Sequence, residues 1–108
     1  MRIVLGSLAL LVLAEMSLYA QLNVGGITGT VHDPSAVMPG VTVAATNTGT
    51  TLTQEAVTNA EGVYSFKLLP IGEYKVAVTH TGFQRFQRTN IQVVSGETVS
   101  IDIKLAVG

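Results

Sequence analysis

The strongest structural signal in this chain lies in two neighbouring stretches, TNAEGVYSF at residues 58–66 and LPIGEY at residues 69–74. They contain a polar turn, a short aromatic strand, a turn with proline and glycine, and a second aromatic strand. An antiparallel β-sheet accommodates so many changes of direction in so few residues, whereas a helix does not. We therefore expect Val63 to Phe66 and Glu73 to Thr79 to be paired neighbours in one sheet.

Aromatic side chains in and beyond these stretches fall at positions expected for a core. Tyr64 and Phe66 share one face of the first strand, and Tyr74 lies on the apolar face of the second. Farther along, Gly82 precedes Phe83, and a glycine before a large ring allows a sharp bend. We therefore expect all four rings to contribute to the core.

The turns between the strands depend on particular residues. Gly62 closes the polar turn, where a positive φ is expected. Pro70 and Gly72 mark the second turn, because proline presets φ and glycine permits backbone conformations that other residues avoid. These three residues are therefore predicted to be structural.

Apolar and polar residues alternate on both sides of this centre, in the ranges 27–32, 41–46, 88–94 and 99–105. A period of two is typical of a strand with one buried face. The range 52–57 is more polar and rich in threonine, which predicts a weak or edge strand. Helical periodicity is missing after position 20. The pattern predicts an all-β fold, with seven strands in an antiparallel Greek-key sandwich, and leaves a closed barrel as the alternative.

The N-terminus has the features of an export signal. Arg2 is followed by an uncharged, apolar run at residues 3–14, which is shorter than the roughly 20 residues of a membrane-spanning helix. A cleaved signal-peptide helix ending at Ala20 is therefore expected, with an uncleaved signal anchor as the alternative. The predicted organisation is a signal peptide at 1–20, a linker at 21–26, a sandwich at 27–105 and a tail at 106–108.

Composition excludes several classes of function. The net charge is −1 and only 12% of the residues are charged, so no basic patch is available for nucleic acid or an anionic membrane surface. The chain contains no cysteine, which excludes disulfides, cysteine-ligated zinc and thiol catalysis. No membrane span is expected in the mature chain, and the fold must be held together by packing.

Residues 26–105 resemble the carboxypeptidase-regulatory-like domain, a small transthyretin-like (prealbumin-like) β-sandwich. The resemblance rests on five features in the order of the family: GTV at 29–31 with Asp33-Pro34, PGV at 39–41, TNAEG at 58–62, Leu69-Pro70 with Gly72 and Tyr74, and Gly82-Phe83. The combination with an export signal is similar to the N-terminal extension of bacterial TonB-dependent outer-membrane receptors. There a plug and a barrel follow, whereas this sequence ends at Gly108, so a stand-alone module, a truncated receptor and a gene fragment all stay open.

Candidate chemical groups are few. His32 and His80 lack partners at the spacing of a zinc site, and a triad of Ser65, His80 and Glu73 lacks a nucleophile elbow. Asp33 and the turn residues Asn59 and Glu61 could offer oxygens to calcium, but the turn lacks the alternating ladder of acidic and amide residues that surrounds such an ion. We therefore expect no catalytic residue, no metal site and no cofactor.

The sequence predicts a non-catalytic, exported accessory module for protein interaction or spacing, located in the periplasm or at the outer membrane. Its partner is expected to be a periplasmic or outer-membrane protein that pairs with a sheet edge such as Leu52 to Val57. The alternative is a carbohydrate-binding module, which requires exposed aromatic side chains. Phe86, between polar neighbours, is the candidate for such a ligand surface.

Overall fold

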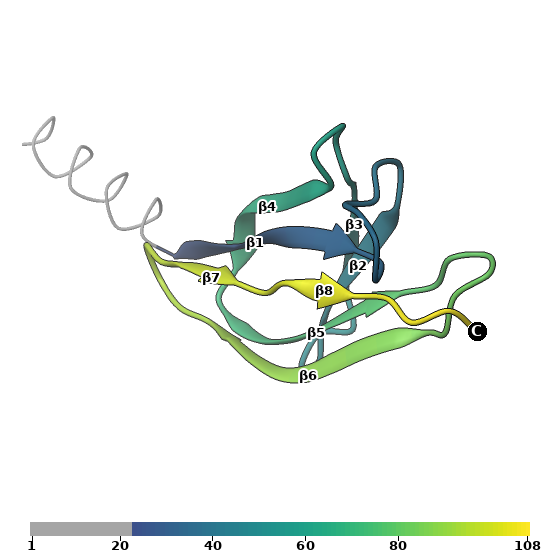
Figure 1. Ribbon diagram of the computed structural model, residues 1–108. Helices are drawn as coiled ribbons and strands as arrows, with labels where there is room; N and C mark the ends of the chain where they lie inside the picture. The colour runs from purple at the N-terminus through teal and green to yellow at the C-terminus, as the bar shows by residue number, and fades with distance from the viewer. Residues whose placement is uncertain (1–22) are drawn as a thin grey trace, which may run out of the picture.

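The computed structural model of this protein describes residues 23–108, and this part is a sandwich of two four-stranded sheets (Figure 1). In the first sheet β4 (Val63–Pro70) and β7 (Thr98–Ser100) flank β1 (Val24–His32), and β8 (Ile103–Lys104) also pairs with β1. The second has the order β3 (Thr53–Val57), β2 (Thr42–Asn47), β5 (Gly72–Val78) and β6 (Phe86–Val93). The all-β sandwich is confirmed, whereas the expected signal peptide lies outside the described residues.

The core lies between the sheets and follows the alternation in the sequence. Every second residue of a strand points inward, because successive side chains of a strand lie on opposite faces. The fully buried side chains include Ile27, Val31, Val41, Val43, Tyr64, Leu69, Val76, Val78, Ile103 and Leu105. Burying one such aliphatic side chain contributes about 1.5–3 kcal/mol to folding, which is how a chain without cysteines holds its shape.

The predicted pairing of the two aromatic strands is wrong. β4 pairs with β1 in the first sheet, and β5 pairs with β2 and β6 in the second. Only Ile71 separates β4 from β5, and a hairpin needs a loop of two residues or more. Gly72, at φ 146°, instead lets the chain form a corner and cross from one sheet to the other.

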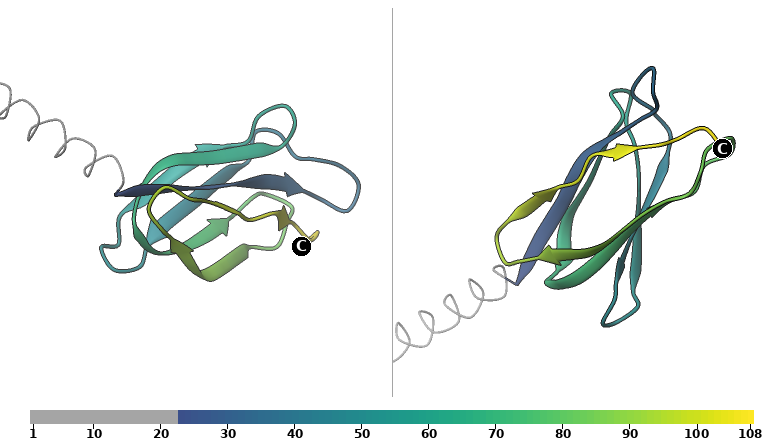
Figure 2. Two further views of the ribbon diagram at one scale, coloured as in Figure 1. Left: turned by 90° about the vertical axis from the view of Figure 1, so that its left-hand side faces the viewer. Right: turned by 60° about the horizontal axis from the view of Figure 1, so that its bottom comes forward.

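The last strand also differs from the antiparallel pairing that the sequence predicts. β7 and β8 run parallel to β1, with Ile27 opposite Val99 and Val31 opposite Ile103 (Figure 2). They are separated at Asp102, whose carboxylate Oδ1 accepts hydrogen bonds from the backbone N–H and the hydroxyl of Thr30, both at 3.2 Å. A side chain thus takes the place of a backbone acceptor, and the strand is interrupted.

Thr58, the first residue of the polar turn, is a buried hydrogen-bonding residue that sequence reasoning missed. It is 5% exposed, its hydroxyl donates to the carbonyl of Met38 at 2.6 Å, and the same oxygen accepts the N–H of Val41 at 2.9 Å. The polar turn is thereby tied to the chain before β2. The side chain of Asn59 completes the turn by accepting the N–H of Glu61 and of Val63, each at 3.0 Å.

Thr58→Val is expected to destabilise the domain by about 2–4 kcal/mol, because it keeps the side-chain shape but leaves the buried N–H of Val41 and the part-buried carbonyl of Met38 without this partner. Urea unfolding followed by circular dichroism measures the change. Thr53→Val is the matched control, since the hydroxyl of Thr53 bonds only that of Thr46 on an exposed surface, and it should change stability by less than about 0.5 kcal/mol. Equal effects of both substitutions would show that burial of Thr58 carries no energetic consequence.

Candidate interaction site

β3 forms a free edge of the second sheet. It pairs with β2 on one side, from Thr42 opposite Val57 to Thr46 opposite Thr53, and no described strand pairs with its other side. In an antiparallel ladder, alternate residues turn their backbone groups toward the partner strand. The N–H of Asn47 donates to the carbonyl of Leu52, and the N–H of Thr58 donates to the carbonyl of Val41. Leu52 and Thr58, and every second residue between them, therefore turn their backbone groups toward β2. The backbone groups of Thr53, Glu55 and Val57 therefore face away from β2.

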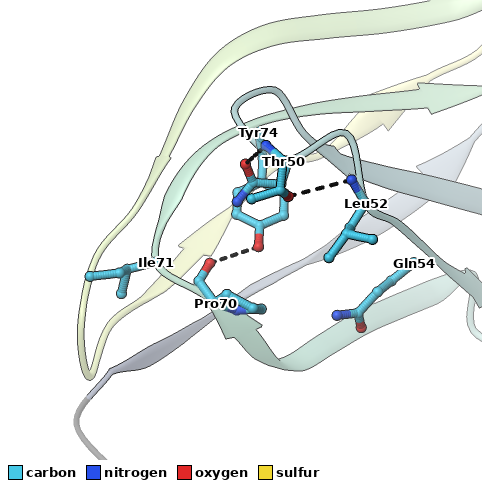
Figure 3. A pocket seen from close by; sticks show the side chains of 7 residues that line it. Thr50, Leu52, Gln54, Pro70, Ile71 and Tyr74 are labelled. Atoms are coloured by element: carbon cyan, nitrogen blue, oxygen red, sulfur yellow. Dashed lines mark hydrogen bonds between the residues drawn. The ribbon is translucent and has the colours of Figure 1, made fainter.

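A groove of about 130 Å³ opens beside the start of this edge (Figure 3). It lies between the chain around β3 and the corner that joins β4 to β5. The lining residues are Asn47, Thr50, Leu52, Gln54, Pro70, Ile71 and Tyr74. The side chain of Leu52 is 69% exposed and that of Ile71 is 49% exposed. Figure 3 shows the Leu52 side chain across from Pro70 and Tyr74, and this mainly apolar lining favours an apolar occupant.

The walls of the groove are held in place by internal hydrogen bonds. The Tyr74 side chain is 2% exposed, and its hydroxyl donates to the carbonyl of Pro70 at 2.7 Å, which fixes the corner (Figure 3). On the other side Asn47 is buried, and its Oδ1 accepts the N–H of Gly49 at 2.9 Å and of Thr50 at 3.1 Å. The groove is therefore formed before any partner arrives.

Sequence reasoning missed the burial of Asn47. The signal was the Asn-x-Gly spacing at 47–49, which is typical of an asparagine that bonds its own backbone two residues later. The neighbouring Thr51 has a positive φ of 63°, an uncommon conformation for a β-branched residue, and its N–H donates to the carbonyl of Asn47. The loop shape that forms one wall is thus dictated by this one asparagine.

The charge at the edge is negative. Glu55 lies in the middle of β3, is exposed, and stands opposite Ala44 on β2. An antiparallel pair of two β3 edges centred on this residue would place two carboxylates opposite each other, which is destabilising. The edge therefore favours a partner with a basic side chain over a second copy of itself.

Other titratable groups have structural roles. The pKa of the Asp33 carboxyl is lowered from its ordinary value of 3.8, first by the N–H of Ala36 and then by that of Ser35. Both bonds go to Oδ1, at 2.8 and 2.7 Å, so this carboxylate caps its own loop. Burial raises the pKa of Tyr64, which keeps the hydroxyl protonated while it donates to the carbonyl of Ile101.

The predicted structural residues are distributed over the sandwich. Tyr64 and Phe66 are buried and meet edge to face, with ring centroids 6.0 Å apart. Pro70 and Tyr74 line the groove, and Gly72 lies against the side chain of Asn47.

Phe83 and Phe86, the two aromatic residues after β5, are less buried than Tyr64 and Tyr74. Phe83 is half-buried, lies next to His80 and forms a bridge with Val107. Gly82, at φ 88°, precedes it as a bend. Phe86 is half-buried, packs against the core and pairs with Val78, so its ring does not stand free on the surface.

Residues that could form a reaction centre are kept apart. Ser65 lies on β4 in the first sheet, whereas Glu73 lies on β5 in the second and accepts a hydrogen bond from Thr48. Within residues 23–108 no group of three histidine or acidic side chains could hold a metal ion. The same part of the chain has no helix with the length and apolar character needed to cross a membrane.

Comparison with known proteins agrees with the sandwich. The family model described as "carboxypeptidase regulatory-like domain" matches residues 26–106. The TonB-dependent transporter Oar of Myxococcus xanthus is 32% identical in an alignment of 81 residues that covers 73% of this chain but only 8% of the transporter.

Solved structures show the same fold at lower identity. The TIE protein of Bacillus anthracis has a TM-score of 0.66 at 24% identity, covering 79% of this chain and 17% of that one. A candidate carbohydrate-binding protein of Bacteroides uniformis has a TM-score of 0.59 at 20% identity, covering 74% of this chain and 40% of that one. At these identities the likeness concerns the fold alone.

Proposed function

Because this chain belongs to the carboxypeptidase regulatory-like domain family, we propose that it is an exported, non-catalytic accessory module that binds an extended segment of a protein partner along β3. The single observation that supports this proposal is the free edge of β3 beside a preformed apolar groove. Strand addition to such an edge gains main-chain hydrogen bonds, and a pocket for alternate side chains adds specificity.

The geometry defines the chemistry of the partner. Its backbone would pair with the outward groups of Thr53, Glu55 and Val57, because these residues turn away from β2. An apolar side chain near one end would enter the groove between Leu52 and Pro70. A lysine or arginine would stand beside Glu55, where opposite charges across a strand pair contribute about 0.2–1 kcal/mol.

The proposal includes the location of the module in the cell. The similarity to part of the Oar transporter supports a location in the periplasm or at the outer membrane. This chain spans 8% of that protein, so transport itself belongs to the whole transporter. A partner of the module would then be a periplasmic or outer-membrane protein.

A carbohydrate ligand is the second candidate, since the sandwich of the Bacteroides uniformis protein is similar. Sugar rings stack on aromatic faces that are open to solvent. Tyr64 and Tyr74 are 1% and 2% exposed, and Phe86 packs against the core. The placement of these rings favours the protein partner.

Selection from a displayed library of random peptides on purified residues 21–108 tests the proposal. Enriched peptides should alternate in hydrophobicity and contain a basic residue, and their binding is measured by fluorescence anisotropy. Glu55→Pro removes an outward N–H without breaking the ladder to β2, which an edge strand tolerates. It should weaken binding at least about tenfold, the equivalent of 1.4 kcal/mol.

Two further variants make the result specific. Leu52→Lys places a charge at the mouth of the groove and should weaken binding to a similar degree. Glu55→Gln keeps the outward N–H, so it should retain backbone pairing and lose only the preference for a basic residue. Peptides that bind all three variants equally would refute the β3 site, and binding of glycans by a protein that selects no peptide would favour the carbohydrate function.

A further inference from the structure

The first and last strands of the sandwich are direct neighbours that run in the same direction. β1 pairs with β7 from Gly26 opposite Thr98, and with β8 up to His32 opposite Lys104. Two parallel neighbours place their starts at one end and their finishes at the other. The chain therefore enters the sandwich at one end and leaves it at the opposite end, as Figure 1 shows for β1 and the C-terminus.

A row of hydrogen bonds joins β1 to residues 97–105, named here the C-terminal strand segment. Along the row, the N–H of Gly26 donates to Glu97, that of Ile101 to Thr28 and that of Leu105 to His32, at 3.0, 2.8 and 2.9 Å. In the middle of the row, the backbone N–H and the hydroxyl of Thr30 donate to the carboxylate of Asp102, and these two bonds are named here the clasp. The hydroxyl of Tyr64 on β4 also donates a hydrogen bond to the carbonyl of Ile101.

These bonds lie across the direction in which the two ends would be pulled. A force on the N-terminal end draws β1 one way, and a force on the C-terminal end draws the C-terminal strand segment the other way. Because strand hydrogen bonds run sideways between strands, the pull slides the two strands past each other and loads all of the bonds together. Separation of strands from one end would break the same bonds one after another.

Side-chain packing opposes the same sliding movement. Ile27 and Val31 on β1 and Ile103 on β8 are fully buried, so a shift along the strand would move them out of their positions in the core. At Gly29 the strands approach so closely that an added Cβ would stand 1.8 Å from the carbonyl oxygen of Ile101. A slide by two residues, which keeps every side chain on its own face, would bring Ile27 or Val31 to that point, and either side chain would clash.

We propose that β1 and the C-terminal strand segment form a mechanical clamp, and that this domain carries tension between the segments joined to its two ends. This function goes beyond binding of a partner along β3, since the clamp lies in the other sheet. A domain with this clamp keeps its fold, and keeps the β3 edge intact, while its ends are pulled apart.

Single-molecule pulling in two directions tests the clamp. The natural chain has no cysteine, so attachment points can be introduced in pairs. Asn23→Cys with Ala106→Cys pulls the clamp in shear. Asn23→Cys with Ser95→Cys pulls at two points of the same end, because the turn at 95–96 lies beside the start of β1, where the N–H of Gly96 donates to Val24. At one loading rate, the unfolding force in shear should exceed the other by about twofold or more, since forced unfolding depends on the barrier at the loaded bonds.

Two substitutions separate the clamp from general stability. Asp102→Ala removes the clasp to Thr30 and should lower the force in the shear direction more than in the other. Thr58→Val lowers equilibrium stability but leaves every bond between β1 and the C-terminal strand segment in place, so it should change the shear force little. Equal forces in the two directions, or a force that follows equilibrium stability alone, would overturn the proposal.

Discussion

Gly29→Ala is expected to destabilise the sandwich by about 3 kcal/mol or more, which is a large fraction of the 5–15 kcal/mol that stabilises a typical domain. The new Cβ would lie 1.8 Å from the oxygen and 2.6 Å from the carbon of the Ile101 carbonyl. Both atoms belong to the backbone, so no side-chain rotation relieves the contact. The two strands would have to separate, and the bonds on both sides of Gly29 would weaken.

Thermal and urea unfolding measure this effect, and amide hydrogen exchange locates it. Protection should fall first at the N–H groups of Ile101 and Leu105, which bond to β1. Gly49→Ala is the matched control, because its Cβ would meet only the side-chain oxygen of Asn47 at 3.4 Å. We expect that control to remain within about 0.5 kcal/mol of the natural protein. A Gly29→Ala protein with unchanged stability would mean that the strands are not as close as the structure places them.

Gly62→Ala is expected to have the second largest effect, about 3 kcal/mol, from two causes that can be separated. Gly62 has a φ of 74°, where a side chain is strained by roughly 1–2 kcal/mol. Its Cβ would also lie 2.8 Å from the carbonyl oxygen of Val31 and 2.9 Å from the Cβ of Val37. The polar turn would therefore be pushed away from β1, although its own hydrogen bonds can form.

Gly96→Ala isolates the first cause. Gly96 has the same φ of 74°, but a Cβ there would have no neighbour within 4 Å. The difference in unfolding free energy between the two variants measures the crowding at Gly62 and should amount to roughly 1–2 kcal/mol. If both variants lose the same stability, the turn has room for a methyl group, and the close approach of Gly62 to β1 has no energetic importance.

Local patterns were sufficient to predict which residues form strands and which side chains face the core. Tyr64, Phe66 and Tyr74 are buried because a strand alternates its faces wherever it is placed. The polar range 52–57 was predicted as an edge strand, and β3 is an edge because threonine, glutamine and glutamate tolerate water on both faces. These features depend only on neighbouring residues in the chain.

Only part of the candidate site could be predicted from the sequence. The edge strand and the two groove residues Pro70 and Tyr74 were singled out, but the groove also needs Leu52, Ile71 and the loop held by Asn47. These residues lie in different segments that meet only after the two sheets have closed. Periodicity contains no information on which ends of two facing sheets meet, so the groove could not be predicted.

Alternation, turn residues and the lack of cysteine were enough to establish an all-β sandwich with a packed core, because each depends on chemistry within a few residues. The sequence could not determine which strands pair, because a strand with one apolar and one polar face can pair with any other strand of the same kind. Folding in three dimensions placed β4 and β5 in different sheets and set the last strand parallel to β1. The causes are contacts between distant residues: a corner at Gly72 too tight for a hairpin, and a carboxylate at Asp102 that reaches the backbone of Thr30.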